Sequence, residues 1–161
     1  MTPRASVVVP VRDRPGVTQR CLAALGRDRP STSFEIVVVD DGSNAETAPR
    51  HCEGSLDVRL VRREAPGGFA VAANAGAARA IGEYLIFLNN DTEPCRGWLD
   101  ALVAHADAHD RAAVVGAKIL YPNDTVQHAG VVIGQDGYPR HVYAGFPADH
   151  PAVSSSRPFR A

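Results

Sequence analysis

The stretch EIVVVDDGSNAET, residues 35–47, decides the fold. The four apolar residues from Ile36 to Val39 form a short run that predicts a buried strand, and the carboxylates of Asp40 and Asp41 follow it directly. The next three residues, GSN, predict a turn and the cap of a short helix that begins near Ala45. A buried strand that ends in polar residues and leads into a helix is the building unit of an α/β sheet.

The same plan recurs along the chain. The run SVVVPV (6–11) predicts a first strand, and apolar residues at helical spacing follow it after the loop RDRPG. VRLVRR (58–63) predicts a third strand, and the glycines at 67 and 68 then open a helix of small residues. A fourth strand is predicted from Tyr84 to Leu88, with a helix beginning near Pro94. Strands that alternate with helices in this way indicate an α/β fold with a mostly parallel sheet flanked by helices.

The chain changes character after Ala113. Residues 113–146 are rich in β-branched residues and turn pairs, which predicts strands and loops without long helices. The last segment, 147–161, holds prolines and a serine run and shows no periodicity, so we expect a loop or a truncated connection there. We therefore expect one α/β domain over residues 1–146, with a β-rich C-terminal part.

Composition narrows the class of protein. The chain has 161 residues and a formal net charge of −1, a balance that indicates neither a disordered tail nor a general nucleic-acid binder. No apolar run approaches the ~20 residues that span a bilayer, and the apolar part of the N-terminus is too short for a secretion signal. The three cysteines are widely spaced, which fits reduced thiols better than disulfides or a zinc site. We therefore expect a cytoplasmic protein.

Polar residues follow three of the predicted strands where each strand ends, at Pro10 to Asp13, at Asp40 and Asp41, and at Asn89 to Asp91. In a parallel sheet these ends lie on one edge, where open α/β sheets bind ligands. Carboxylates gathered there without Lys or Arg nearby in sequence repel one another, and a cation or ligand donors usually relieve such a site. Hard oxygen ligands indicate Mg²⁺ or Mn²⁺. The alternatives are an Asx turn at the aspartate pair and a helix cap at Asn90 or Asp91.

Isolated amide and imidazole side chains supply further candidates. Asn74 stands among small apolar residues and needs a partner if it is buried. His105 and His109 lie four residues apart beside two aspartates, and we expect both to be solvated. His128 and His141 lie in a glycine-rich region, where either could line a pocket.

In combination these motifs resemble the inverting glycosyltransferases of family 2, which share the GT-A fold. The resemblance is carried by SVVVPVRDRP (6–15), EIVVVDDGSNAET (35–47), GGFAVAANAGAARAIGEYLIFLNNDTEP (67–94) and VQHAGVVIG (126–134). It covers nearly the whole chain, and the ordered combination is highly specific, whereas DDGS alone is not. The resemblance implies a GT-A (Rossmann-like) domain that binds a nucleotide-diphosphate sugar and a divalent metal for inverting transfer to an acceptor hydroxyl, in an enzyme of the hexosyltransferase type.

The resemblance assigns the nucleoside to the first two strand ends. It implies that Pro10, Val11 and Arg12 line the nucleoside pocket. It also implies that Asp41 accepts a hydrogen bond from the base, with Asp40 in support. An aspartate that faces the base suits a ring N–H, which favours uracil or thymine without excluding guanine. We therefore expect a UDP- or dTDP-linked sugar.

The remaining donor contacts are implied at the third helix and the fourth strand. By resemblance, Gly68 and Asn74 shape the nucleoside pocket. The segment NND (89–91) stands where the family has its DXD motif, which implies that Asn90 faces the ribose and that Asp91 holds Mg²⁺ or Mn²⁺ on the diphosphate. The motif begins here with Asn in place of Asp, which leaves Asp91 as the one dependable metal carboxylate.

Family members continue into an acceptor-binding half that supplies the catalytic carboxylate. The resemblance therefore implies a catalytic base beyond Ala161, with the 161 residues alone binding the donor without transferring its sugar. It also implies a glycan or lipid-linked acceptor in cell-surface polysaccharide synthesis, compatible with peripheral membrane association. It implies no nucleic-acid partner.

The sequence leaves one alternative function open and disfavours two others. A nucleotide-sugar-binding module without chemistry of its own stays open as the alternative. A dinucleotide-dependent oxidoreductase is disfavoured because VRDRPG (11–16) stands where G-x-G-x-x-G is needed. A sugar nucleotidyltransferase would need a glycine-rich loop with a basic residue at the same place.

Overall fold

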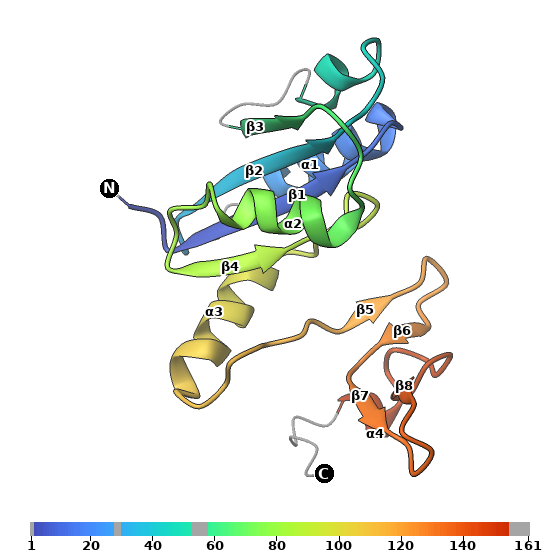
Figure 1. Cartoon of the computed structure of the whole chain (residues 1–161). Helices are drawn as coiled ribbons and strands as arrows, with labels where there is room; N and C mark the ends of the chain where they lie inside the picture. Colours follow the sequence, from blue (N-terminus) through green and yellow to red (C-terminus); the bar gives the residue numbers. More distant parts are fainter. Residues whose placement is uncertain (1, 28–29, 53–57, 155–161) are drawn as a thin grey trace. The chain divides into compact units, whose positions relative to one another are not determined.

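The computed structural model of the chain describes residues 2–27, 30–52 and 58–154 (Figure 1). They belong to two compact units, Met1–Val103 and Ala104–Ala161. No helix of the described residues is long and apolar enough to cross a membrane.

The first unit is built on a parallel four-stranded sheet in the order β3-β2-β1-β4. Its strands are β1 (Ala5–Val11), β2 (Phe34–Asp41), β3 (Val58–Arg63) and β4 (Tyr84–Phe87). Its helices are α1 (Pro15–Arg27), the 3₁₀ helix η1 (Ala48–Cys52), α2 (Phe69–Ala77) and α3 (Trp98–Ala108), the last of which continues into the second unit. The predicted α/β fold with a mostly parallel sheet flanked by helices is confirmed.

Helices cover both faces of the sheet, whose two central strands, β1 and β2, are apolar on both sides. Val7 and Val9 pack with Leu22 of α1 on one face, whereas Val8 packs with Ala72 of α2 on the other. Figure 1 shows α2 in front of the sheet and α1 behind it. Strands buried on both faces lose the alternation of polar and apolar residues, which explains the continuous valine runs in the sequence.

The helix of small residues, α2, lies very close to the sheet. A Cβ atom added at Gly76 would stand 2.4 Å from Cγ1 of Val8 and 2.8 Å from Cγ2 of Val39. The glycine and alanine side chains of α2 therefore permit a close approach that larger residues would prevent. At the start of this helix the Gly68 amide donates a hydrogen bond to Asp41, the last residue of β2.

We expect Gly76→Ala to destabilise the fold by about 1–3 kcal/mol, because overpacking a filled core has that cost. Chemical denaturation with the fluorescence of Trp98 as probe measures the change. Gly26→Ala is the matched control, since a Cβ atom at Gly26 in α1 meets nothing within 4 Å. The control substitution should leave the stability unchanged or raise it slightly, because alanine has a higher helix propensity than glycine. An equal loss of stability in both variants would contradict the close approach of α2 to the sheet.

A polar network at the start of β4 fixes the register of that strand. The Glu35 carboxylate oxygen Oε1 accepts hydrogen bonds from Ser6 Oγ at 2.7 Å and from the Ile81 amide at 2.8 Å. The Gly82 amide donates to Ser6 Oγ at 2.8 Å. These bonds anchor the chain just before β4.

Two predicted helix starts were wrong by several residues. The helix expected near Ala45 begins at Ala48, because the Asn44 side chain first accepts hydrogen bonds from the amides of Glu46 and Thr47 and closes a turn. The helix expected near Pro94 begins at Trp98. Gly97 has φ +78, which is outside the helical region, so the helix starts directly after it.

The second unit contains short antiparallel pairs, as expected for its β-branched sequence. Strands β5 (Ile119–Leu120) and β6 (Val126–His128) form one pair, and β7 (Val131–Ile133) and β8 (Pro139–His141) form the other. A short helix, α4 (Pro151–Ser154), lies in the segment 147–161 that was expected to be a loop. The rest of that segment, residues 155–161, lies outside the described residues.

Candidate functional site

The predicted polar segments gather at the carboxyl edge of the parallel sheet. The register pairs Val11 with Asp40 between β1 and β2, and Val8 with Phe87 between β1 and β4. The Leu88 amide then donates to the carbonyl of Val8 at 3.0 Å, so the chain continues along β1 before it turns. The ends of β1, β2 and β4 are thus brought together, as the sequence predicted.

The loops after β1 and β2 are joined by Asp13. Its amide donates to Ser43 Oγ at 2.8 Å, and its carboxylate Oδ1 accepts hydrogen bonds from the Asn44 amide at 3.2 Å and from Thr47 Oγ1 at 3.1 Å. Asp13 and Arg14 both have positive φ, +49 and +53, which are uncommon for residues other than glycine. The sequence placed Asp13 in the polar cluster, but its linking role depends on contacts about 30 residues away that no local pattern reveals.

The nucleoside-pocket candidates of β1 differ in exposure. Val11 is buried, Pro10 is half-buried, and Arg12 is exposed. The Arg12 side chain forms a long ion pair with Asp13 at 3.9 Å, which contributes little at an exposed position. Among the described residues, Arg12 is therefore a cation at the edge of the sheet without a strong partner of its own.

Asp40 is fully buried and depends on an arginine of the neighbouring strand. Its Oδ1 accepts a hydrogen bond from the Ser43 amide at 2.9 Å. Its Oδ2 lies 3.4 Å from Arg62 Nη1, an ion pair without hydrogen-bond geometry, and is a buried oxygen with no hydrogen-bond partner among the described residues. Arg62 also donates to the Ser43 carbonyl at 3.3 Å, so it holds both the carboxylate and the turn that follows.

Asp41 is bound tightly at the start of α2. Its carboxylate accepts hydrogen bonds from the Gly67 amide at 3.0 and 3.1 Å, from the Gly68 amide at 2.7 Å, and from Arg63. Burial acts to raise the pKa of Asp41, but these three donors outweigh it and hold the pKa below its usual value. Asp41 therefore joins β2 to the loop between β3 and α2, and it carries a negative charge at neutral pH.

A cation or ligand donors were expected to relieve the carboxylates at this edge, but at the aspartate pair two arginines of β3 do so. The register of β2 and β3 sets Asp40 opposite Arg62 and Asp41 opposite Arg63. The signal was present in the sequence as the last two residues of VRLVRR, but only the strand register shows which carboxylate each arginine meets. The aspartate pair is thus neutralised by the protein, and a bound cation is not needed at this point of the edge.

Lowering the pH should reduce the stability of the fold, because Asp41 becomes protonated. Because the folded pKa of Asp41 is lowered, its contribution to stability is complete above the unfolded value of about 3.9 and is lost as the pH falls towards the folded value. Hydrogen bonds from Thr32 and Ser31 lower the pKa of Asp100 to about 2, so its contribution is lost in the same direction.

We expect the urea midpoint to fall as the pH drops below about 4, and Asp41→Asn to be less stable at pH 7 with a shallower acid loss. Asp110→Asn, at an exposed position, is the control and should retain the wild-type profile. If Asp41→Asn loses stability at low pH as steeply as the wild type does, other carboxylates cause the effect.

The turn after β4 is held against α1. Asn90 Nδ2 donates to Thr18 Oγ1 at 2.9 Å, and the thiol of Cys21, one turn further along α1, contacts the Asn89 carbonyl at 3.8 Å. Burial raises the pKa of the Cys21 thiol to about 11, so this cysteine stays protonated and inert. The Asn90 amide, expected to face a ribose, is thus used at least in part to fix the turn.

Asp91 follows that turn and is exposed. No group of three or more His, Cys, Asp and Glu side chains within the described ranges is placed to hold a metal ion. Asp91 therefore offers a single carboxylate, which fits a cation that takes its other ligands from phosphate oxygens and water, as Mg²⁺ does. It does not fit a cation held by the protein alone.

Gly68 and Asn74 lie on α2. Gly68 precedes the first residue of the helix with φ +83, and its amide points to Asp41. Asn74 is exposed, so it does not need the buried partner that its apolar surroundings suggested.

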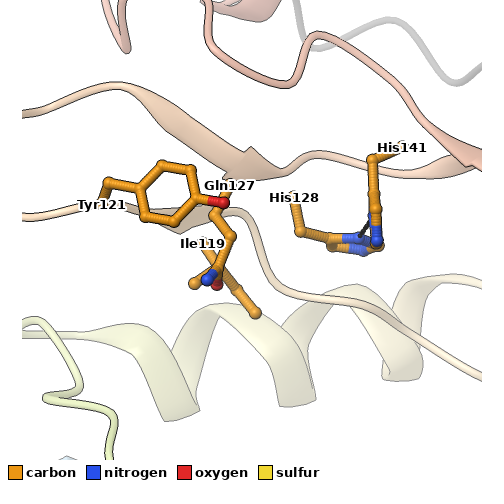
Figure 2. Close-up of a pocket in the computed structure, with 5 residues that line it drawn as sticks. All are labelled: Ile119, Tyr121, Gln127, His128 and His141. Atoms are coloured by element: carbon orange, nitrogen blue, oxygen red, sulfur yellow. Dashed lines mark hydrogen bonds between the residues drawn. The ribbon is translucent and has the colours of Figure 1, made fainter.

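Four histidines of the second unit form two pairs in different settings. His105 and His109 are exposed and stack with their ring centroids 4.2 Å apart, in line with the solvated position expected. His128 and His141 line a cavity of about 400 Å³ and meet through their Nδ1 atoms at 2.8 Å (Figure 2). The cavity is also lined by Ile119, Tyr121 and Gln127.

The sequence of this chain is similar to a known protein family and to known proteins. The profile of the family described as glycosyl transferase family 2 matches residues 6–144. The O-antigen biosynthesis protein RfbC of Myxococcus xanthus is 37% identical over 149 residues, which cover 91% of this chain and 12% of that protein. The chain thus spans about an eighth of the length of this relative.

Solved structures share the fold. A mannosyltransferase from Pyrobaculum calidifontis, in complex with GDP-Man and Mn²⁺, superposes with a TM-score of 0.61 at 26% identity, over 77% of this chain and 37% of that one. Residues 1–349 of S. aureus TarS, in complex with UDP, give a TM-score of 0.57 at 23% identity, over 73% of this chain and 39% of that one.

Proposed function

Because the chain belongs to glycosyl transferase family 2 and has its GT-A fold, we propose that the carboxyl edge of the sheet binds the nucleoside diphosphate of a sugar donor for inverting transfer to an acceptor hydroxyl. One observation carries the proposal. Three strand ends meet at this edge, and there two aspartates are fixed by arginines while a third, Asp91, is left exposed. An edge of this kind offers both a preformed wall and a free charge.

In this proposal the nucleoside lies along Pro10, Val11 and Arg12, beside the Asp40 and Asp41 pair. The loops that carry these residues are joined through Asp13, so the pocket wall is formed before the ligand arrives. A preformed wall reduces the entropy lost on binding. An aspartate facing the base favours a pyrimidine ring N–H, hence uracil or thymine.

Gly68 and Asn74 complete the proposed pocket from α2. The close approach of α2 to the sheet keeps Gly68 beside Asp41, and the exposed Asn74 amide is free to turn towards a ligand. Asn90 contributes by holding the turn against Thr18, and its carbonyl side-chain oxygen remains an acceptor for a ribose hydroxyl.

Asp91 would hold Mg²⁺ or Mn²⁺ on the diphosphate. When bound, the cation neutralises the negative charge that develops on the diphosphate leaving group. The contribution of this chain is to fix the carboxylate: Thr18 and Cys21 hold the two asparagines that precede it. The Mn²⁺ in the related mannosyltransferase complex supports this assignment.

We further propose a role in cell-surface polysaccharide or glycan synthesis, with a glycan or lipid-linked acceptor at the cytoplasmic side. Support comes from the O-antigen biosynthesis protein, which is 37% identical to this chain. A nucleotide-sugar-binding module without chemistry of its own is the second candidate. It is favoured by the fact that Asp40 and Asp41 are both held by hydrogen bonds and by arginines, while the exposed Asp91 is assigned to the cation.

Calorimetric titration with UDP, dTDP and GDP, each with and without Mn²⁺, tests donor binding. We expect saturable binding of a pyrimidine nucleotide that Mn²⁺ strengthens. Absence of binding by all three nucleotides would contradict the proposed function.

A sugar-transfer assay tests the chemistry separately. We expect the 161 residues to bind the donor without transferring sugar, because the residues assigned here include no proton acceptor for the hydroxyl. Transfer to an added acceptor would contradict this expectation, whereas slow hydrolysis of the donor by water would not.

A further inference from the structure

The second unit is held together by little apolar burial. Of the described residues 104–154, Val126 alone is buried, and the strand pairs β5 with β6 and β7 with β8 belong to separate sheets. The three cysteines of the chain all precede this unit, so it cannot contain a disulfide of its own. Small units with so little core are usually stabilised by a disulfide, a metal ion or a partner. A metal ion between the two strand pairs would supply such a link.

A pair of imidazoles joins the two strand pairs. His128 is the last residue of β6, and His141 is the last residue of β8. Their Nδ1 atoms are 2.8 Å apart, and the two ring planes are nearly perpendicular, at 81° (Figure 2). We propose that these two nitrogen atoms bind Ni²⁺ or Cu²⁺, and that the ion clips the two strand pairs together.

The distance between the two nitrogen atoms selects the kind of ion. Metal–imidazole bonds are about 2.0–2.1 Å long, so two nitrogens 2.8 Å apart subtend an angle of about 84–89° at the ion. This angle matches neighbouring ligands of a square-planar or tetragonal ion, the geometry that Cu²⁺ and Ni²⁺ prefer. Tetrahedral Zn²⁺ would need the two nitrogens about 3.3 Å apart. Imidazole is also a ligand that both Cu²⁺ and Ni²⁺ favour.

In the free protein the same two nitrogen atoms share one hydrogen. One Nδ1 donates to the other, so the two neutral rings hold opposite tautomers. To bind the ion, the donating ring moves its hydrogen from Nδ1 to Nε2, and both Nδ1 lone pairs then face the metal. No proton is released in this exchange. The hydrogen bond thus holds the two ligands near the spacing that the ion needs before it binds.

The surroundings of the pair permit a cation. The cavity of about 400 Å³ beside it has no lysine or arginine in its lining. Arg140, which precedes His141 in β8, is paired with the Asp136 carboxylate and adds no free positive charge. The Gln127 side chain supplies a neutral oxygen to the lining, and water can take the remaining positions of the ion. Because two imidazoles are fewer ligands than a closed structural site has, we expect an ion that exchanges with the solution.

This site differs in chemistry from the one proposed at Asp91. A single carboxylate combined with phosphate oxygens suits Mg²⁺ or Mn²⁺, whereas two imidazoles suit Ni²⁺ or Cu²⁺. The inference therefore goes beyond the proposed donor site and does not depend on it.

Calorimetric titration of the untagged chain with Ni²⁺, in the absence of nucleotide, tests the site. We expect saturable binding that His141→Gln weakens at least tenfold, because losing even an outer-shell partner costs ten- to hundredfold in metal affinity. Glutamine keeps a hydrogen-bonding group beside His128 and removes the imidazole ligand. Unchanged Ni²⁺ affinity in His141→Gln, or no saturable binding by the wild type, would overturn the proposal.

The stacked pair of His105 and His109 on α3 supplies the matched control. Their ring planes are 21° apart, so one ion cannot lie in the planes of both rings as they stand. His109→Gln should therefore keep the wild-type Ni²⁺ affinity, and Asp91→Asn should keep it as well. Loss of binding in His109→Gln instead of His141→Gln would place the ion on the helix and overturn the proposal.

Cu²⁺ tests the position of the ion on the unmodified protein. Because Cu²⁺ is paramagnetic, a substoichiometric amount should broaden the NMR signals of His128 and His141 before any others. Broadening that begins elsewhere would overturn the proposal without the need for a variant. Zn²⁺ should bind more weakly than Ni²⁺, and tighter binding of Zn²⁺ would contradict the angle near 90°.

Urea unfolding, followed through the amide NMR signals of the second unit, tests the clip. Saturating Ni²⁺ should raise the midpoint of the wild type and leave that of His141→Gln unchanged, because an ion stabilises only the form that binds it. An equal rise in both proteins, or none in either, would overturn the clip. UDP binding should be the same in His141→Gln as in the wild type, so the fate of the donor site is read separately.

Discussion

Asp41→Ala should lower both the stability of the fold and the affinity for the nucleotide. The substitution leaves the Arg63 guanidinium and the amides of Gly67 and Gly68 without their common acceptor. Removing one partner of a buried ion pair costs about 3–5 kcal/mol, and we expect about 3, because the Arg63 side chain keeps 25% of its exposure and is partly solvated. Nucleotide affinity should fall by about ten- to hundredfold, the effect of losing a hydrogen bond to a charged group.

Denaturant unfolding and calorimetric titration with UDP measure these two effects at a temperature where the variant is folded. Arg63→Gln is the matched control, because it weakens the same corner and leaves the carboxylate in place. A direct contact between Asp41 and the base predicts a much larger loss of affinity in Asp41→Ala than in Arg63→Gln. Equal losses would mean that Asp41 acts only by holding Gly67 and Gly68, and unchanged affinity in both would remove the aspartate from the site.

Asp91→Asn should abolish the dependence of diphosphate binding on Mn²⁺ or Mg²⁺. The substitution keeps the shape of the side chain and removes the charge that the cation needs. Folding should be retained, because Asp91 is exposed and asparagine caps a turn about as well as aspartate. In the presence of Mn²⁺, UDP affinity should fall to the value that the wild-type protein has without metal, while uridine alone should bind as before.

A melting curve together with UDP titrations at several Mn²⁺ concentrations separates a metal ligand from a simple cap. A cap predicts a small change of stability and wild-type metal dependence. Asp110→Asn removes an exposed charge elsewhere and should leave both properties unchanged. Wild-type metal dependence in Asp91→Asn would show that the assignment of NND is wrong.

The strands and their order of appearance follow from local pattern. Continuous valine runs in β1 and β2 indicate strands covered on both faces, and the glycine pair before α2 marks its start. The same reasoning predicts that Asp40 and Asp91 lie at one edge of the sheet, because the carboxyl ends of parallel strands lie on the same side. These features depend on short stretches of sequence.

The contacts that fix the site could not be read in this way. The bond between Asn90 and Thr18 joins residues 72 positions apart, and Asp13 meets Thr47 only once two loops have folded together. The arginines of β3 were visible, but their partners depend on the register of two strands. The contact between His128 and His141 likewise depends on how two short strand pairs are arranged. The sequence therefore indicated that either residue could line a pocket, but not that the two form a hydrogen bond.

The most direct test of the central claim is an amide NMR titration of the chain with UDP and Mg²⁺. We predict saturable shifts at the carboxyl edge, at Arg12, Gly68 and Asp91, with little change at the opposite ends of the strands, near Ala5, Phe34 and Tyr84. Saturable shifts at those opposite ends, or none anywhere in the first unit, would contradict a donor site at this edge.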